Sequence, residues 1–399
     1  MIKKIPTSRL RVGMYIYDLN CDWASHPFAL NDFQITSQGQ IREIMKIGIE
    51  AVYIDTDRGL DVEDTAAGSP PDDAGERPPE YETKPLIEEL AAAANVRKKA
   101  IGMMSRIMED VRAGKPVEME QITPAVENMA RSILRNTDAS VGLTRIKRVD
   151  KYTAEHCVNV SILMMAFHKS LSLDDDELVQ TGISGLLQDI GKARIPEYIL
   201  NKPGGLTPKE TAAVRRHVKY GLEILKKTPG ISAVSLRTVA EHHERFDGSG
   251  YPAKMRGDLI SLYGQMAAIS DVYDALTADR AYKKGIPPHA AMIELLQTGQ
   301  HNSALVQKFI HCIGIYPVGS LVALSNGCFA VVIESNSDNL LHPRVKIIFD
   351  SIKRQYLPPE VVDLSSPDKK EDLTIISAID AKKWHIRPEE FLEHARYFP

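Results

Sequence analysis

The feature that most constrains the fold is a long block of helical periodicity between Leu86 and about residue 313. Its first segment, LIEELAAAANVRKKAIGMMSRIMEDVRAG, repeats aliphatic residues at three- and four-residue spacing and stops at Gly114. A second helix is predicted through ITPAVENMARSILRN, and helices are predicted to continue along the block. The centre of the chain is therefore predicted to be an all-α bundle.

Shorter β-rich segments flank this block. Residues 1–64 combine β-rich runs such as MYIYDL and AVYID with one helical patch, QIREIMKIG, and predict a small α+β domain. Residues 316–399 contain GSLVALSNGCFAVVIE and RVKIIFD, which are β-branched runs between turn residues, and predict a small β-rich module. The chain is thus predicted to be multidomain, with connecting helices at 86–140 and the main helical domain at 141–315.

A polar segment separates the first domain from the helices. Residues 65–85, TAAGSPPDDAGERPPEYETKP, hold five prolines and seven charged residues with almost no aliphatic ones. Such a composition cannot bury enough apolar surface to fold. We therefore predict a disordered linker there.

Composition excludes several classes of function. The formal net charge of −4 argues against duplex nucleic acid as a ligand, because a phosphate backbone requires a basic face. The four cysteines lie far apart and form no C-x-x-C pair, which favours a reducing compartment. No stretch approaches the roughly 18 apolar residues of a membrane span, and the start has no apolar run of signal-peptide length. These observations predict a cytoplasmic protein without a membrane span.

Histidines and aspartates in the helical block are candidate metal ligands. A vicinal histidine pair stands in EHHERFDGSGYP, and two aspartates stand in the aliphatic runs LLQDIGK and AAISDVYDAL, which would bury them. A buried carboxylate without a partner is costly, which favours a cation beside it, and imidazole and carboxylate suit iron, manganese and zinc. The candidates are His156, Asp189, His217, His242, His243 and Asp271.

Core histidines are the plain alternative. A single histidine on an apolar helix is more often a satisfied core residue than a ligand. Six candidate residues in order shift the balance, so the residues alone leave the two interpretations equally weighted. The remaining histidines are interpreted as structural or exposed: His26, His168, His289, His301, His311, His342, His385 and His394.

Three runs of this block together resemble a known family. LLQDIGKARIPEYILNKPGGLT, HHERFDGSGYP and ISDVYDALTADRAYK are similar to the signature runs of HD-GYP cyclic dinucleotide phosphodiesterases, over residues 141–313. Residues 1–64 resemble, less specifically, the uncharacterised domain that often precedes HD-GYP in bacterial proteins. The resemblance implies an all-helical bundle around two or three metal ions, with the six candidates named above at its ligand positions. It also implies hydrolysis of a 3′,3′-cyclic dinucleotide, cyclic di-GMP or cyclic GMP-AMP, to a linear 5′-phosphorylated dinucleotide.

The chain departs from the family pattern at two positions. The histidine that directly precedes the bridging aspartate in the family is Gln188 here, and the glutamate that supports a third metal in some members is Tyr152. We therefore expect two divalent ions, with Asp189 bridging them and Gln188 as a further ligand through its carbonyl oxygen. An amide oxygen is a harder donor than imidazole and favours manganese or magnesium over iron, although all three stay open.

Further roles follow from the resemblance alone. Lys192 would hold the scissile phosphate or protonate a leaving oxygen beside Asp189, and Tyr251 would contact a base or a phosphate. Arg280 and Lys283 would bind phosphate oxygens. Without the family resemblance, Arg280 and Lys283 would be interpreted as a solvated helix end, and Tyr251 as a packed aromatic residue of a loop.

Two other functions remain as alternatives. A degenerate module could bind a cyclic dinucleotide without cutting it if Gln188 leaves only one metal. A generic HD-type nucleotide phosphohydrolase would need the metals but no GYP loop. A homodimer and a protein partner of the N-terminal domain also stay open.

Overall fold

The computed structural model describes most of the chain. The described residues are 2–20, 33–35, 38–46, 48–49, 51–61, 82–145, 152–278, 284–336, 339–366 and 373–392.

The described part divides into two compact units. One takes residues from Met1–Tyr81 together with His168–Leu178, and the other takes Glu82–Phe167 and Val179–Pro399. Within the described ranges, no helix is both long enough and apolar enough to span a membrane.

The N-terminal unit contains a four-stranded antiparallel sheet in the order β1-β4-β2-β3. In β4 the buried residues alternate with more exposed ones, and Val52 and Ile54 pack with Ile41 and Ile44 of the helix α1. This arrangement confirms the predicted α+β domain. The elements are β1 (Ile2–Pro6), β2 (Tyr15–Asp18), β3 (Phe33–Gln34), α1 (Gln38–Lys46) and β4 (Ala51–Asp55).

The second unit begins with the predicted helices. The segment predicted from Leu86 to Gly114 forms α2, which ends at Arg112, and ITPAVENMARSILRN lies in α3. The helices of the bundle are α2 (Leu86–Arg112), α3 (Met119–Arg135), α4 (Thr137–Leu143), α5 (Tyr152–Ser170), α6 (Leu178–Leu187), α7 (Glu197–Leu200), α8 (Pro208–Arg215), α9 (His217–Leu225), α10 (Ala233–Glu241), α11 (Leu262–Thr277), α12 (Pro288–Gln297) and α13 (Ser303–Ile313), with the 3-10 helix η5 (Ile190–Arg194).

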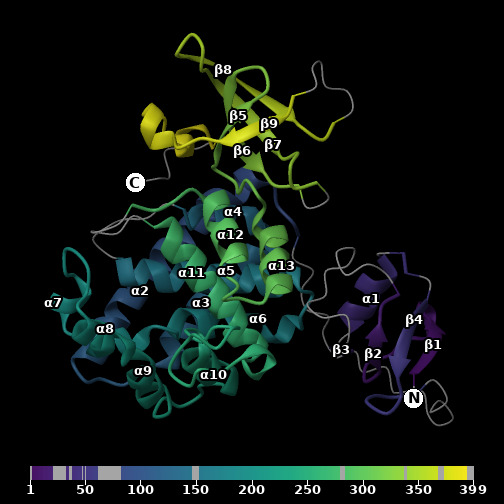
Figure 1. Ribbon diagram of the computed structural model, residues 1–399, viewed down its shortest axis with the longest axis vertical. Coiled ribbons are helices and arrows are strands. Elements are labelled where there is room, and N and C mark those ends of the chain that lie inside the picture. Colours follow the sequence, from purple (N-terminus) through teal and green to yellow (C-terminus); the bar gives the residue numbers. More distant parts are fainter. Residues whose placement is uncertain are drawn as a thin grey trace. The chain divides into compact units, whose positions relative to one another are not determined.

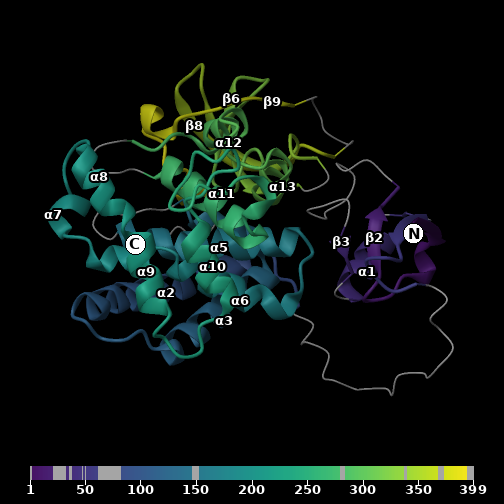
Figure 2. The same ribbon diagram turned by 60° about the horizontal axis from the view of Figure 1, so that its bottom comes forward.

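Helix α5 lies among the other helices of the bundle in both views (Figures 1 and 2). Every residue from Ala154 to Phe167 is buried. A helix that is apolar on all sides must be surrounded by other helices, and SILMMAF supplies that composition. The few polar side chains on α5, among them His156 and Asn159, must therefore find partners inside the protein.

The C-terminal module is a five-stranded antiparallel sheet in the order β8-β7-β6-β5-β9. Leu321, Phe329 and Ile348 of the sheet share one apolar cluster with Leu90 of α2 and Leu143 of α4. The predicted β-rich module is thus confirmed, and it rests on the helices that begin the bundle. Its strands are β5 (Leu321–Leu324), β6 (Cys328–Glu334), β7 (Arg344–Asp350), β8 (Gln355–Asp363) and β9 (Ile375–Ala378).

Candidate active site

Asp189 lies at the end of the apolar helix α6, where the chain turns into η5. Its side chain is fully buried, and its Oδ2 accepts a hydrogen bond from Lys192 Nζ at 2.6 Å. A 3-10 turn places residues i and i+3 directly above one another, which brings the ammonium to the carboxylate. Burial alone would raise the pKa of Asp189, but Lys192 and the surrounding histidines hold it well below its usual value.

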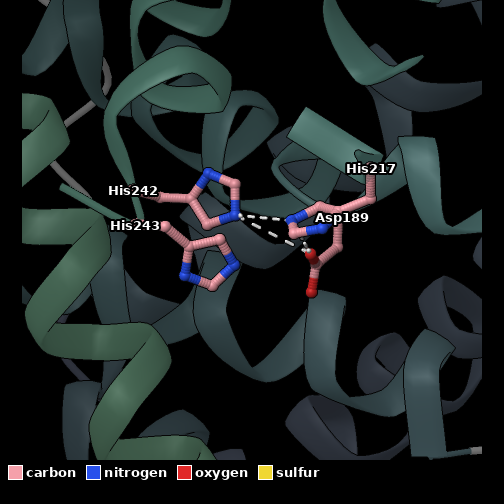
Figure 3. A group of neighbouring side chains, drawn as sticks. All are labelled: Asp189, His217, His242 and His243. Atoms are coloured by element: carbon pink, nitrogen blue, oxygen red, sulfur yellow. Dashed lines mark hydrogen bonds and ion pairs between the residues drawn. The ribbon is translucent and has the colours of Figure 1, made fainter. Parts of the chain in front are cut away.

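Three histidines face the other carboxylate oxygen of Asp189 (Figure 3). His217 is the first residue of α9, and His242 and His243 follow the last residue of α10. The two consecutive histidines reach one site because the helix stops there, whereas an α-helix would turn neighbouring side chains by about 100°.

Backbone carbonyls fix the orientation of two of these rings. Nδ1 of His217 lies 2.7 Å from the carbonyl oxygen of Val214, and Nδ1 of His242 lies 3.0 Å from that of Val239. Each Nδ1 therefore carries the proton, and each Nε2 presents a lone pair to Asp189.

Asp189 Oδ1 and the Nε2 atoms of His217 and His242 face one another, and all three are electron-pair donors. The two Nε2 atoms are 3.3 Å apart, and they lie 3.3 Å (His217) and 3.7 Å (His242) from Asp189 Oδ1. This oxygen is buried and has no hydrogen-bond partner. Lone pairs gathered in this way repel one another unless a cation lies between them, so the residues fit a divalent metal ion.

Asp189 also belongs to a second group, with His156 of α5 and Asp271 of α11. His156 Nε2 lies 2.9 Å from Asp271 Oδ1 and 3.4 Å from Asp189 Oδ2, and its Nδ1 lies 2.7 Å from Asp274 Oδ2. Burial lowers the pKa of His156, but the three carboxylates outweigh it and raise this pKa to about 10. A cation bound by the same groups would displace the proton that they stabilise.

Gln188 lies beside this second group. Its Nε2 is 3.4 Å from Asp271 Oδ1, while its Oε1 is buried and has no hydrogen-bond partner. An orphaned buried carbonyl oxygen is costly, and a nearby cation would relieve that cost.

Burial keeps the rings of His217 and His243 in the uncharged form. Burial lowers the pKa of His217 to about 4. It also lowers the pKa of His243 well below the usual value, and His242 adds to the effect. Near neutral pH these imidazoles are therefore uncharged, which is the form that binds metals.

A loop after α10 places Tyr251 over the site. The Tyr251 ring stacks on His243 with centroids 4.6 Å apart and an interplanar angle of 26°. The buried carboxylate of Glu244 fixes the loop by accepting the backbone N–H groups of Ala253 and Met255. A Cβ on Gly250 would lie 2.4 Å from the backbone nitrogen of Arg245, so the loop can close this tightly only with glycine there.

The structure brings most of the predicted site residues together. His156, Gln188, Asp189, His217, His242, His243 and Asp271 form the two adjoining groups, with Lys192 and Tyr251 against them. Arg280 and Lys283 lie outside the described residues, as does the side chain of Tyr152. Their roles stay predictions.

The other histidines have varied surroundings. His168 Nε2 lies 2.8 Å from the carbonyl oxygen of Asp174, His301 is buried, and His311 and His385 are exposed. His289 and His342 are half-buried. His26 and His394 lie outside the described residues.

Sequence reasoning missed three residues around the site. Asp274 is one turn after Asp271 on α11 and orients His156, and this three-residue spacing was the only signal for it. Asn159 bonds Asp274 from α5. Arg215 at the end of α8 is exposed, and its guanidinium carbon lies 4.7 Å from the centroid of the Tyr251 ring.

The family comparisons divide the chain into three parts, but their first boundary lies later than the one in the fold, where the N-terminal unit ends at Tyr81. Residues 2–122 match the family described as "Domain of unknown function (DUF3391)". Residues 126–303 match "HD domain", and residues 321–385 match "KOW domain associated with HD domain".

Among the individual proteins that the chain resembles, one that matches nearly its whole length shows the family. A solved structure, "Bd1817, a HDG"Y"P protein from Bdellovibrio bacteriovorus", aligns with 77% of this chain and 98% of its own at 17% identity and a TM-score of 0.47. The "3'3'-cGAMP-specific phosphodiesterase 2" of Vibrio cholerae is 33% identical over 50% of this chain and 40% of its own. The "Cyclic di-GMP phosphodiesterase PA4108" of Pseudomonas aeruginosa is 36% identical over 97% of this chain and 94% of its own. With that similarity from end to end, and with the expected histidines and aspartates gathered in one site, the chain belongs to the HD-GYP family of cyclic dinucleotide phosphodiesterases.

Proposed function

We propose that this protein hydrolyses a 3′,3′-cyclic dinucleotide, cyclic di-GMP or cyclic GMP-AMP, to the linear 5′-phosphorylated dinucleotide. The observation that carries the proposal is the position of Asp189, which is the one residue shared by both candidate ligand groups. A carboxylate with one oxygen toward each group can bridge two ions, and paired ions are a recurring device for phosphodiester hydrolysis. The names of the relatives supply the substrate class.

Two divalent ions would share Asp189. His156, Asp271 and the carbonyl oxygen of Gln188 would hold one ion, and His217, His242 and His243 would hold the other. Manganese and magnesium suit the oxygen-rich first group better than iron does. When bound, such ions neutralise phosphoryl charge and lower the pKa of water near the scissile phosphate.

Lys192 would act on the same phosphate. Its ammonium lies at the edge of both groups, and although burial lowers its pKa, Asp189 and Asp271 raise it above the usual value. A lysine that holds its proton this firmly is a weak acid. We therefore assign Lys192 Nζ to hydrogen bonding with a phosphoryl oxygen rather than to protonating the departing 3′ oxygen.

Tyr251 and Arg215 would contact the bases. The stack from His243 through Tyr251 ends in an exposed, planar guanidinium, and such a surface suits a purine ring. Arg280 and Lys283 remain proposed phosphate ligands. Residence in the cytoplasm, a homodimer and a partner for the N-terminal domain also remain proposals.

A turnover assay tests the proposed function. Purified full-length protein with manganese is given each cyclic dinucleotide, and the products are separated by chromatography. We expect a linear dinucleotide with a 5′-phosphate. Binding of either substrate without turnover at any manganese concentration would favour the sensor, and hydrolysis of ordinary nucleotides instead would favour the generic phosphohydrolase.

Replacing Arg215 should weaken substrate binding without changing the chemical step. A stacked guanidinium contributes about 0.5–2 kcal/mol, so Arg215→Ala should raise KM by about two- to thirtyfold and leave kcat within about twofold. Arg216→Ala is the matched control, because it removes the same charge one residue away, where the guanidinium lies near Tyr220 instead. Equal increases in KM for the two variants would show a general charge effect and no contact.

Changing Gln188 to histidine should tighten metal retention. Imidazole is a better ligand than an amide oxygen, so Gln188→His should keep more manganese through dialysis and gain more thermal stability per unit of added manganese. Metal analysis and thermal unfolding measure both effects. Gln180→His on the same helix α6 is the control. Wild-type protein that already retains two ions after chelator treatment would contradict a weak first site.

A further inference from the structure

A chain of buried hydrogen bonds connects helix α2 to the candidate ligand His156. His156 Nδ1 lies 2.7 Å from Asp274 Oδ2, and the other oxygen of Asp274 accepts a hydrogen bond from Asn159 Nδ2 at 3.0 Å. The oxygen of the Asn159 amide accepts a hydrogen bond from Arg97 Nε at 3.1 Å. All four side chains are buried.

The direction of each bond in this chain is fixed. Arg97 can only donate and an ionised Asp274 can only accept, so the Asn159 amide has one productive orientation between them. Its second N–H donates to the carbonyl oxygen of Thr144 at 3.2 Å. The amide therefore uses its oxygen and both of its hydrogens, which leaves it no freedom to rotate.

Helix α2 contacts both the C-terminal module and this chain of hydrogen bonds. Leu90, Ala93 and Arg97 are spaced three and four residues apart and so lie on one face of α2. Leu90 and Ala93 pack in the apolar cluster with the C-terminal sheet, while Arg97 enters the hydrogen-bond chain to the site. One helix face thus joins the C-terminal module to a metal-ligand position.

We propose that Arg97 and Asn159 are positioning residues that hold Asp274, and through it His156, in the orientation needed to bind metal. The carboxylate fixes the tautomer of a ligating histidine and raises its basicity, and the amide and the guanidinium fix the carboxylate. The proposal rests on the metal site of the proposed function and does not depend on which substrate the protein cuts.

Manganese affinity is the measurement that tests this role. Free manganese is titrated against full-length protein by electron paramagnetic resonance, with folding checked by circular dichroism. Asn159→Leu keeps the side-chain size and removes every hydrogen bond of the amide. It should weaken manganese binding by about tenfold, which is the lower end of the loss in metal affinity when a residue that orients a metal ligand is replaced. Ser161→Ala is the matched control, because Ser161 is equally buried on α5 but bonds only the carbonyl oxygen of Gly182 among the contacts described.

A second experiment separates positioning from packing. Arg97→Met and Asp274→Asn are measured singly and together. If the residues act through Asn159, the double variant loses less manganese affinity than the product of the two single losses. Independent losses would overturn the proposal, and so would wild-type affinity in folded Asn159→Leu or an equal loss in Ser161→Ala. Manganese binding without cyclic dinucleotide turnover would contradict the proposed function alone.

Discussion

Asp189→Asn should abolish turnover and release bound metal. The substitution keeps the shape of the side chain and removes the one negative charge that both ligand groups share. If both ions depend on that carboxylate, several kcal/mol of stabilisation of the reaction are lost, which corresponds to at least about a thousandfold lower rate. Metal analysis after gel filtration and the product assay measure the two effects, and wild-type metal content with near-normal turnover would contradict the assignment.

The ion pair between Asp189 and Lys192 makes a second variant necessary. Lys192 is 2.6 Å away and largely buried, and a buried ammonium left without its carboxylate destabilises a protein by about 3–5 kcal/mol. Asp189→Asn alone could therefore lose metal simply by unfolding. Asp189→Asn/Lys192→Met removes both charges and should stay folded while remaining inactive, so thermal unfolding of the two variants separates loss of structure from loss of metal.

The helical bundle was predictable because its periodicity is long and regular. Helix α2 runs over 27 residues with aliphatics on a repeating face, and α5 is apolar on all sides. The two β-rich regions were recognisable from alternating β-branched runs. These patterns depend on local sequence alone, so they can be recognised without any knowledge of how the helices pack.

The candidate ligand positions were predictable for a different reason. His156, Asp189, His242 and Asp271 stand in runs whose order matches a family, so their convergence did not have to be derived from spacing. Their chemistry alone left a metal site and a polar core equally weighted. The observation that favours a metal site is geometric: Asp189 Oδ1 and two imidazole lone pairs face one another with no hydrogen bond to the oxygen.

The supporting residues could not be found in the same way. Arg97 and Asn159 are 62 positions apart, and nothing in either local sequence marks a pair. Asp274 has the same residue type and helix as Asp271, but it binds the far side of the His156 ring. Whether a carboxylate can bind a metal or orient a ligand depends on which ring nitrogen of His156 it meets, and only the packing of the helices decides that.

Gly191→Ala should disrupt both the fold and the metal site. A Cβ on Gly191 would lie 1.9 Å from the carbonyl oxygen of His217 and 2.5 Å from the backbone nitrogen of Gly221. Backbone atoms cannot move aside as a flexible side chain can, so α9 would have to shift away from η5. His217 is the first residue of α9 and faces Asp189 at 3.3 Å, so the same shift would separate the two ligands.

The expected losses are large, because overpacking costs about 1–3 kcal/mol, and more where the clash is with backbone, and a misplacement of about 1 Å lowers catalytic rates by about a hundredfold. Thermal unfolding, manganese titration and turnover measure them. Gly102→Ala in α2 is the matched control, since its Cβ meets nothing within 4 Å and alanine favours a helix interior by about 0.5–1 kcal/mol. If Gly191→Ala retained wild-type stability and manganese affinity, the contact between η5 and α9 could not be what sets the distance from Asp189 to His217.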